Sequence, residues 1–427
     1  MGSFGLTSHQ VQLLFVDLAL ILLLARGLGA LAARVGQPPV VGEILAGILL
    51  GPTLFHGVIA HAMFPTAIRQ PLAAMANVGV ALFMFAVGLE IEHQTVRSRG
   101  RLAAMAALGS TAVPFGLGLA LAAYVLDGHA PAHRHTTFLV FVGLSVSVTA
   151  FPVLARILAD RGLTRTTLGG IALATAAIVD VVAWIGLAVV QAAAGGNGGA
   201  WRVALIVAFA AAMMLLVRPL LRRYLAPARL GATRTTWPLA MVLVGALLSA
   251  AGTEAIGLHP IFGAFLFGMA MPREGTAFLR TDVHDRVGQI TALLLPIYFV
   301  IAGLQVDLSR LHAAELTQLA AIMAVAVAGK FGGTYLGTRL LGLPSRPATA
   351  LATLMNTRGL TELIILGIGL QIGLLDGSLY SLMVAMAVVT TVMTGPLLSL
   401  IYRRPVVVPA VDRAKETELV GQGATPV

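Results

Sequence analysis

The chain has 427 residues, of which 58% are hydrophobic and only 11% are charged. A soluble globular domain carries about 25% charged residues, so the composition excludes an ordinary water-soluble protein. The sequence has no cysteine, which excludes disulfides, zinc–thiolate sites and thiol catalysis. The net charge of +10 comes from basic residues that stand between apolar blocks, a pattern of membrane topology. We therefore expect membrane lipids as partners and no nucleic acid.

The apolar blocks are about 20 residues long, the length that a helix needs to cross the hydrocarbon core. They predict an all-α polytopic membrane protein with about 13 transmembrane helices. The first block continues to Leu24 without a cleavage site, so we predict a span there and not a signal peptide. The predicted spans are 10–32, 39–57, 72–91, 103–126, 136–158, 167–193, 201–223, 236–252, 256–272, 288–304, 313–338, 347–371 and 378–402.

The basic residues predict the orientation of these spans. Two of the 28 lysines and arginines, Lys330 and Arg358, fall inside spans, and almost all of the others fall in loops on one side of the membrane. Cytoplasmic loops carry the excess of basic residues. We therefore predict a multi-pass protein of the plasma membrane with its N-terminus outside and its C-terminus in the cytoplasm. Residues 1–404 form the predicted membrane domain, and 405–427 a short cytoplasmic tail.

Two spans carry sequence that does not suit an unbroken helix. The fifth contains Ser145-Val-Ser-Val-Thr-Ala-Phe-Pro152, and the twelfth contains Asn356-Thr-Arg-Gly-Leu-Thr-Glu362. Proline breaks the helical hydrogen-bond ladder, and irregular backbone at membrane depth is tolerated only inside protein or beside a water-filled cavity. The two spans are seven apart, so they run in opposite directions. Interrupted helices in two inverted halves indicate a transporter binding site; ordinary kinks in a helix bundle are the alternative.

Asp180 is the strongest candidate for an ion site. It lies in the middle of the sixth span, with no charged residue within a helical turn. Ionisable residues at this depth are costly and mark ion or proton pathways. A carboxylate can hold either a proton or a monovalent cation, but not both, and this competition would couple their fluxes. A buried structural ion pair is the alternative role.

Three further charges lie deep in the predicted spans. Lys330 is the only lysine in a span, and an amine can lose its proton when it is buried, whereas a guanidinium cannot. Its alternative role is that of a lysine that snorkels to the cytoplasmic surface. Arg358 and Glu362 are four residues apart, so on a helix they would neutralise one another. We expect these three residues to compensate charge around the interrupted spans.

Seven segments of the chain resemble one known family. The chain is similar to the monovalent cation:proton antiporter superfamily, in the branch with bacterial sodium/proton antiporters, potassium-efflux systems and plant cation/proton exchangers. The matching segments run in order along nearly the whole chain. They are 40–52, 82–90, 145–152, 178–184, 257–265, 295–303 and 356–362.

The resemblance implies a sodium/proton antiporter-like fold of inverted repeats, in which two broken helices cross beside Asp180. It implies a homodimer that works by an elevator-like motion, with a core at about 103–193 and 313–402, a dimerisation panel at about 10–91 and 236–304, and a linker helix at about 201–223.

The resemblance also implies the site. Asp180 would bind the proton and would be the ligand of the monovalent cation. Ser147, Thr149 and Thr357, at the two interruptions, would contribute to the same ion and proton binding. No cofactor is expected beyond the transported H+ and Na+ or K+. Electrogenic members of the family have two adjacent aspartates, but Val179 precedes Asp180 here. We therefore expect electroneutral exchange.

The same residues also fit other functions. Asp180 would also serve a channel or a proton-coupled K+ uptake system on the same scaffold, or a sensor that does not transport. An intramembrane hydrolase would need a nucleophile and a base such as Ser147 and His259, but no G-x-S-x-G motif supports one, so we expect no enzyme. Without a G-x-G-x-x-G after a strand, no attached nucleotide-binding domain is expected either.

Overall fold

The computed structural model describes residues 7–54, 57–90, 93–131, 134–164, 166–194, 199–225, 237–272, 277–309 and 312–401, and the secondary structure in these ranges is helical. The predicted tail at 405–427 lies outside them. The helices are α1 (Ser8–Arg34), α2 (Pro39–Leu50), α3 (Val58–Met63), α4 (Thr66–Glu90), α5 (His93–Tyr124), α6 (Leu126–His129), α7 (His135–Ser147), α8 (Phe151–Asp160), α9 (Thr167–Ala194), α10 (Gly199–Ala212), η3 (Met213–Val217), α11 (Arg218–Tyr224), α13 (Trp237–Ala255), α14 (Ile261–Ala270), α15 (Ala277–Leu304), α16 (Ala313–Arg339), α17 (Ser345–Met355), α18 (Leu360–Gln371) and α19 (Gly377–Ile401).

The all-helical membrane architecture predicted from the sequence is confirmed. Among the described residues, eight helices are long and apolar enough to cross a membrane, or nine if the pair α17 and α18, bent by 41°, is one span. The other predicted spans correspond to shorter helices, such as the 12 residues of α2 and the 10 residues of α14. Each predicted range thus contains at least one helix, although fewer than 13 helices in the described part of the chain have the full length of a span.

The predicted span at 201–223 is not a regular α-helix. It is divided into α10, the π-helical segment η3 and α11, and Pro219 is the second residue of α11. Proline has no N–H and its ring clashes with the carbonyl four residues earlier. The wider turn of the π-helical segment η3 accommodates Pro219, because the N–H of Arg218 bonds to the carbonyl of Met213, five residues back.

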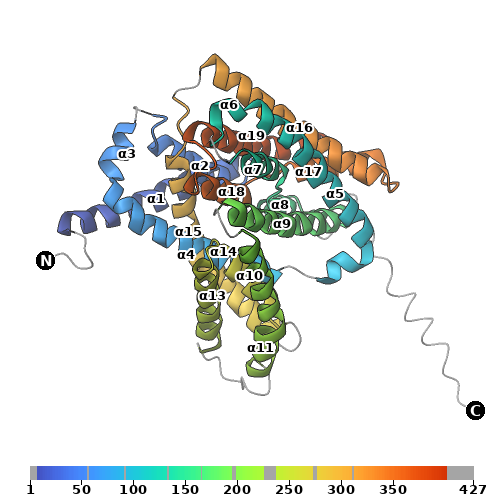
Figure 1. The fold of residues 1–427 in the computed structure, drawn as a ribbon, viewed down its shortest axis with the longest axis horizontal. Helices are drawn as coiled ribbons and strands as arrows, with labels where there is room; N and C mark the ends of the chain where they lie inside the picture. Colours follow the sequence, from blue (N-terminus) through green and yellow to red (C-terminus); the bar gives the residue numbers. More distant parts are fainter. Residues whose placement is uncertain are drawn as a thin grey trace, which may run out of the picture.

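The helices form groups that pack through small residues (Figure 1). On the side of the N-terminus α1 and α2 pack together and α15 packs against α2 and α4, while α14 joins α4 to α13. On the other side α5 packs against α7, α9 and α16. A Cβ atom on Gly109 of α5 would lie 2.1 Å from the carbonyl oxygen of Gly333 of α16, so only glycine permits this contact.

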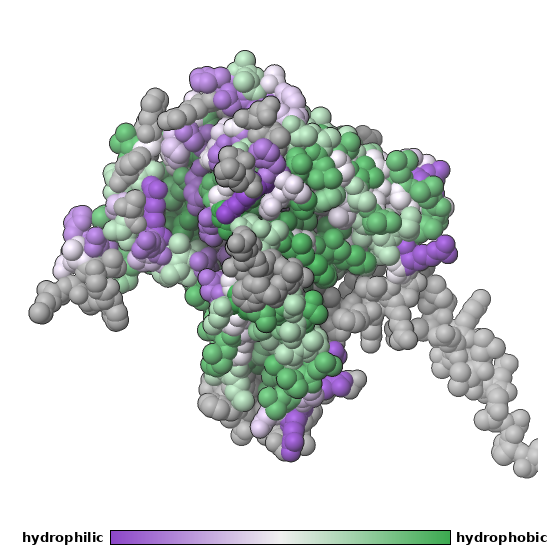
Figure 2. Space-filling model, viewed as in Figure 1, coloured by the Kyte–Doolittle hydropathy of each residue, from purple (hydrophilic) through white to green (hydrophobic). Residues whose placement is uncertain are grey.

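The outer surface is that of a membrane protein. Figure 2 shows hydrophobic residues over much of the visible face, with hydrophilic residues gathered mainly at its upper left and near its lower tip. Large apolar side chains point outward on many helices, including Leu23 at 70%, Leu215 at 73% and Leu248 at 67% exposure. Exposed apolar area of this extent marks an interaction surface, which for spanning helices is the lipid.

Candidate functional site

The two interrupted spans meet at their interruptions. Helix α7 ends at Ser147 and α8 begins at Phe151, while α17 ends at Met355 and α18 begins at Leu360. The amide of Ala150 donates to the carbonyl of Thr357 at 3.0 Å, and the hydroxyl of Thr149 donates to the carbonyl of Met355 at 2.9 Å. Each interruption thus supplies hydrogen-bond partners that the other has lost, as backbone buried in a membrane protein requires.

The sequence explains why the two interrupted spans can cross at this point. Pro152 is the second residue of α8, where its missing N–H removes no helical bond. Gly359 ends the second interruption, and a Cβ there would lie 2.6 Å from a methyl carbon of Val153. The close approach of the two spans therefore needs glycine at this position.

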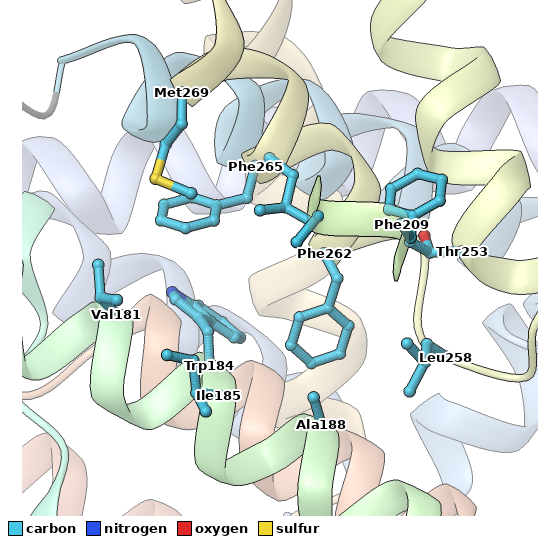
Figure 3. Close-up of a pocket in the computed structure, with 12 residues that line it drawn as sticks. Val181, Trp184, Ile185, Ala188, Phe209, Thr253, Leu258, Phe262, Phe265 and Met269 are labelled. Carbon is cyan, nitrogen blue, oxygen red and sulfur yellow. The ribbon is translucent and has the colours of Figure 1, made fainter. Parts of the chain in front are cut away.

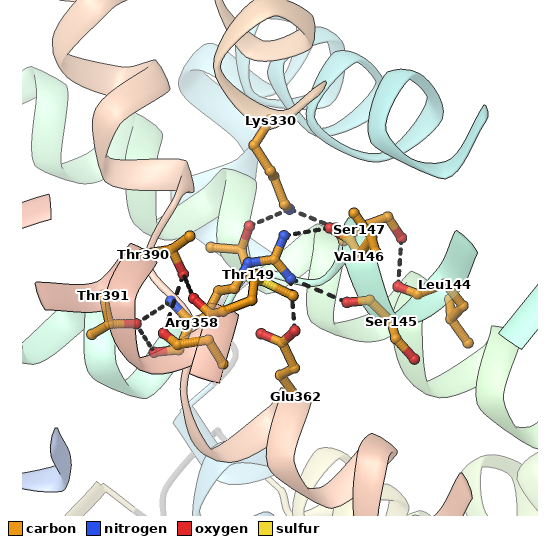
Figure 4. A network of polar contacts seen from close by, with 12 residues as sticks. Leu144, Ser145, Val146, Ser147, Thr149, Lys330, Arg358, Glu362, Thr390 and Thr391 are labelled. Carbon is orange, nitrogen blue, oxygen red and sulfur yellow. Dashed lines mark hydrogen bonds and ion pairs between the residues drawn. The ribbon is translucent and has the colours of Figure 1, made fainter. Parts of the chain in front are cut away.

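Two buried cations cover the carbonyl end of α7 (Figure 4). The last carbonyls of a helix have no partner within it and carry partial negative charge. The Arg358 guanidinium donates to the carbonyls of Ser145 at 3.2 Å and Val146 at 2.5 Å, and Lys330 Nζ donates to the carbonyl of Ser147 at 2.5 Å. Both cations are fully buried. Lys330 is therefore not a snorkelling side chain.

Glu362 neutralises one of these cations. Its carboxylate lies 2.9 Å from Nη1 of Arg358, and both side chains have no exposed surface. Glu362 stands in the first turn of α18, where a negative charge is favoured by the helix dipole. Thr391 of α19 fixes the backbone of Arg358. The Thr391 hydroxyl accepts from the amide of Arg358 at 2.9 Å and donates to the carbonyl of Arg358 at 2.7 Å.

Asp180 lies beside the opposite helix ends. It is 1% exposed, and its carboxylate interacts with the backbone N–H of Phe151 and the hydroxyl of Thr361, in the first turns of α8 and α18, and electrostatically with Lys330. Helix N-termini are favourable sites for negative charge. The oxygen Oδ1 of Asp180 has no hydrogen-bond partner among the described residues. The carboxylate is therefore held in place but retains one oxygen for a further ligand.

Other oxygens of the second interruption are also unpartnered. Within the described part of the chain, Oδ1 of Asn356 and Oγ1 of Thr357 are buried and accept or donate no hydrogen bond. Buried polar atoms are nearly always satisfied, so each exception requires an explanation such as an unseen water or ion. The crossing therefore offers oxygen ligands from α9 and from the second interruption.

The other expected site residues have assigned partners. Lys330 Nζ also donates to Oγ1 of Thr149 at 2.5 Å, and the described ion pairs include none between Lys330 and Asp180. The Ser147 hydroxyl donates to the carbonyl of Leu144 at 2.8 Å, so its proton is directed to its own helix and not to His259. The backbone oxygen of Ser147 accepts from Lys330.

Sequence reasoning missed Ser110, Asn356, Thr361 and Thr391. Ser110 accepts from Lys330 Nζ at 3.2 Å. Their common signal is a hydroxyl or amide within a predicted span or interruption, but serine and threonine also occur in spans where they only bond to their own helix. The sequence could not separate these two cases.

A small cavity with polar residues in its wall, the polar cavity, lies along α18. It has a volume of about 90 Å3, and the residues of α18 that line it are Ile364, Gly367, Ile368 and Gln371, which form one helix face. Its opposite wall includes Asn77 of α4, His259 and Gln305. It therefore separates α18 from α4 and α15.

Comparison with known proteins gives consistent matches. The model of the family described as "Sodium/hydrogen exchanger, transmembrane" matches residues 19–404. The Na+/H+ antiporter NhaS4 of Synechocystis sp. is 38% identical over 413 residues, which are 93% of this chain and 99% of that protein. The K+/H+ antiporter 1 of Saccharomyces cerevisiae is 33% identical over 412 residues, and the cation/H+ antiporter 20 of Arabidopsis thaliana is 36% identical over 414 residues.

These relatives differ in length. The chain covers 47% of the yeast protein and 48% of the plant protein, so it spans about half the length of several relatives that it matches. Among solved structures, the sodium proton antiporter MjNhaP1 from Methanocaldococcus jannaschii at pH 8 aligns with a TM-score of 0.65 at 14% identity, over 92% of this chain and 96% of that chain. This likeness shows the same fold.

Proposed function

The chain belongs to the transmembrane sodium/hydrogen exchanger family of cation/proton antiporters, and we propose that it exchanges Na+ or K+ for H+ by alternating access at Asp180. The observation that carries the proposal is the buried carboxylate of Asp180, which keeps one unpartnered oxygen beside the N-terminal ends of two interrupted helices. Lone ionisable groups at this depth serve ion and proton pathways.

Competition for one carboxylate would couple the two fluxes. A proton on Asp180 neutralises it, and a cation held by Asp180 Oδ1 with the oxygens of Asn356 and Thr357 would do the same. The empty carboxylate would instead remain charged and buried, which is costly. The site would therefore switch its access from one side of the membrane to the other when Asp180 holds either ion, and it would rarely switch when Asp180 is empty.

The charges around the crossing support an electroneutral exchange of one cation for one proton. Glu362 is paired with Arg358, and Val179 occupies the position next to Asp180. Lys330 bonds to Ser110, Ser147 and Thr149. Among the described residues at the crossing, Asp180 is therefore the one carboxylate that a transported ion would neutralise, and each half-cycle would carry a single positive charge.

The packing of the helices supports a division into two moving parts. We propose that α5, α7–α9 and α16–α19 form a core that slides against a panel of α1, α2, α4 and α13–α15, with α10–α11 as the linker. The polar cavity beside α18 lies between these parts and would admit ions to Asp180 from one side of the membrane. We further propose a homodimer through the panel, in the plasma membrane, with the N-terminus outside.

Transport by the purified protein in liposomes tests the proposal. The vesicles are acidified inside, a pH-sensitive dye reports the internal pH, and Na+, K+ or Li+ is added between pH 6 and pH 9. At least one cation should dissipate the gradient in the wild type, and Asp180→Asn should abolish this response because an amide neither binds nor releases the proton. Full activity of Asp180→Asn would refute the mechanism.

Two further measurements separate the remaining alternatives. An imposed membrane potential should leave the exchange rate unchanged, and a clear response would refute electroneutrality while leaving antiport intact. A channel or a proton-coupled uptake system would move the cation without the opposite movement of protons. Cation flux without a change of internal pH would therefore replace antiport with channel-like transport.

A further inference from the structure

A second cavity, of about 180 Å3, separates α9 from α10, α13 and α14 (Figure 3). Its wall on α9 begins at Val181, directly after Asp180, and continues through Trp184 to Ala188. Phe209 of α10 and Phe265 of α14 form part of the opposite wall. The cavity thus lies along the helix that carries the candidate ion site, on a side different from the polar cavity beside α18.

The lining of this cavity excludes water. Thr253 is its one hydroxyl-bearing residue, and that hydroxyl is already used, since it donates to the carbonyl of Ala250 at 2.9 Å and accepts from the amide of Gly263 at 3.2 Å. Trp184 is 3% exposed, and its indole N–H has no partner among the described residues. A buried water needs two to four polar partners, and one N–H is too few.

The mouth of the cavity faces lipid. Ile185 lines the cavity and is 61% exposed, and the neighbouring Val182 and Val189 are 44% and 46% exposed on the same helix. Helix α9 is one of the candidate membrane spans, so these side chains meet hydrocarbon and not water. The cavity is therefore continuous with the lipid-facing surface of α9.

The volume suits a hydrocarbon segment. An apolar cavity of about 150 Å3 in a soluble protein binds benzene, so about 180 Å3 holds roughly seven carbon atoms at the same density. We propose that this cavity is a binding site for the acyl chain of a membrane lipid, which enters beside Ile185 and packs against Trp184. The inference rests on the cavity and its surroundings and does not depend on the proposed transport function.

Tryptophan fluorescence tests the proposal directly. The chain has three tryptophans, so Trp201→Phe with Trp237→Phe leaves Trp184 as the single reporter. The full chain is reconstituted in phosphatidylcholine with or without bromine on the acyl chains, because bromine quenches indole fluorescence on contact. The fluorescence of the buried Trp184 should be quenched about as strongly as that of a lipid-exposed reporter. The reporter is provided by Ile185→Trp in a chain that also carries Trp184→Phe.

Substitutions that fill the cavity complete the test. Ala188→Leu, or Ala210→Leu on the opposite wall if the first variant does not fold, should reduce the quenching of Trp184 several-fold. Ala112→Leu, on an exposed part of α5 that does not line this cavity, should leave it unchanged.

Two results would overturn the proposal. If Trp184 is not quenched while the exposed reporter is, the cavity is empty or holds a molecule other than lipid. If quenching persists undiminished in both filled variants, it reaches Trp184 through the wall and not from a bound chain.

Discussion

The buried guanidinium of Arg358 makes a strong prediction about stability. It bonds to Glu362 and to the carbonyls of Ser145 and Val146. Removing one partner of a buried ion pair costs about 3–5 kcal/mol, so this is the expected loss for Glu362→Gln. Arg358→Met loses the same pair and leaves two buried carbonyls unpaired, at about 1–3 kcal/mol each. Its total of about 5–11 kcal/mol approaches the whole stability of an ordinary protein.

The double variant separates the two contributions. In Arg358→Met with Glu362→Met both charges are gone, and replacing a buried pair by apolar residues is nearly neutral. Only the two carbonyls remain unpaired, so we expect a loss of about 2–6 kcal/mol, which is smaller than the loss in Arg358→Met alone. Unfolding free energies come from denaturation of the purified protein in mixed micelles, followed by circular dichroism.

Two results would refute this reasoning. If Arg358→Met is no less stable than Glu362→Gln, the guanidinium does not support the end of α7. If the double variant has the stability of the wild type, the carbonyls find other partners, and the interrupted helix does not depend on a buried cation.

Three further predictions concern other parts of the molecule. Outside the spans, the hydrogen bond to Asp376 raises the pKa of His129, and although burial alone would raise the pKa of Asp376, the bond from His129 lowers it. The stabilisation from His129 is thus complete below about pH 6.5 and is lost as the pH rises through its raised pKa. The protection of the amides at the start of α19, measured relative to their intrinsic exchange rate at each pH, should fall over this range. His129→Gln should remove this fall, and an unchanged protection profile in that variant would contradict the reasoning. Gly333→Val should destabilise the protein, because the added Cβ meets the backbone of α5. Gly332→Val should not, because a Cβ there meets nothing within 4 Å. Equal melting temperatures of the two variants would contradict the close contact. Lys330→Met should lower the unfolding free energy by about 2–5 kcal/mol through its lost hydrogen bonds to buried oxygens, and wild-type stability would show that these oxygens find other donors.

The sequence alone determined the class of the protein and the position of its interruptions. Long apolar blocks, alternating basic loops and two interrupted spans are local properties, and lipid requires each span to satisfy its own backbone. Asp180, Lys330, Arg358 and Glu362 could be singled out for the same reason, because a charge inside an apolar block is costly wherever the chain folds. The sequence does not specify the length of helices such as α14, since a buried helix can be shorter than the membrane is thick.

Only the tertiary structure decided which groups meet. Arg358 and Glu362 are four residues apart, and their pair followed from helix geometry, but the bonds from Arg358 and Lys330 to the end of α7 join residues about 180 to 210 positions apart. The same holds for Asp180 beside the first turns of α8 and α18, and for the cavity between α9 and α14. Such contacts depend on how the helices cross, and a one-dimensional pattern of apolar and polar residues does not specify the crossing.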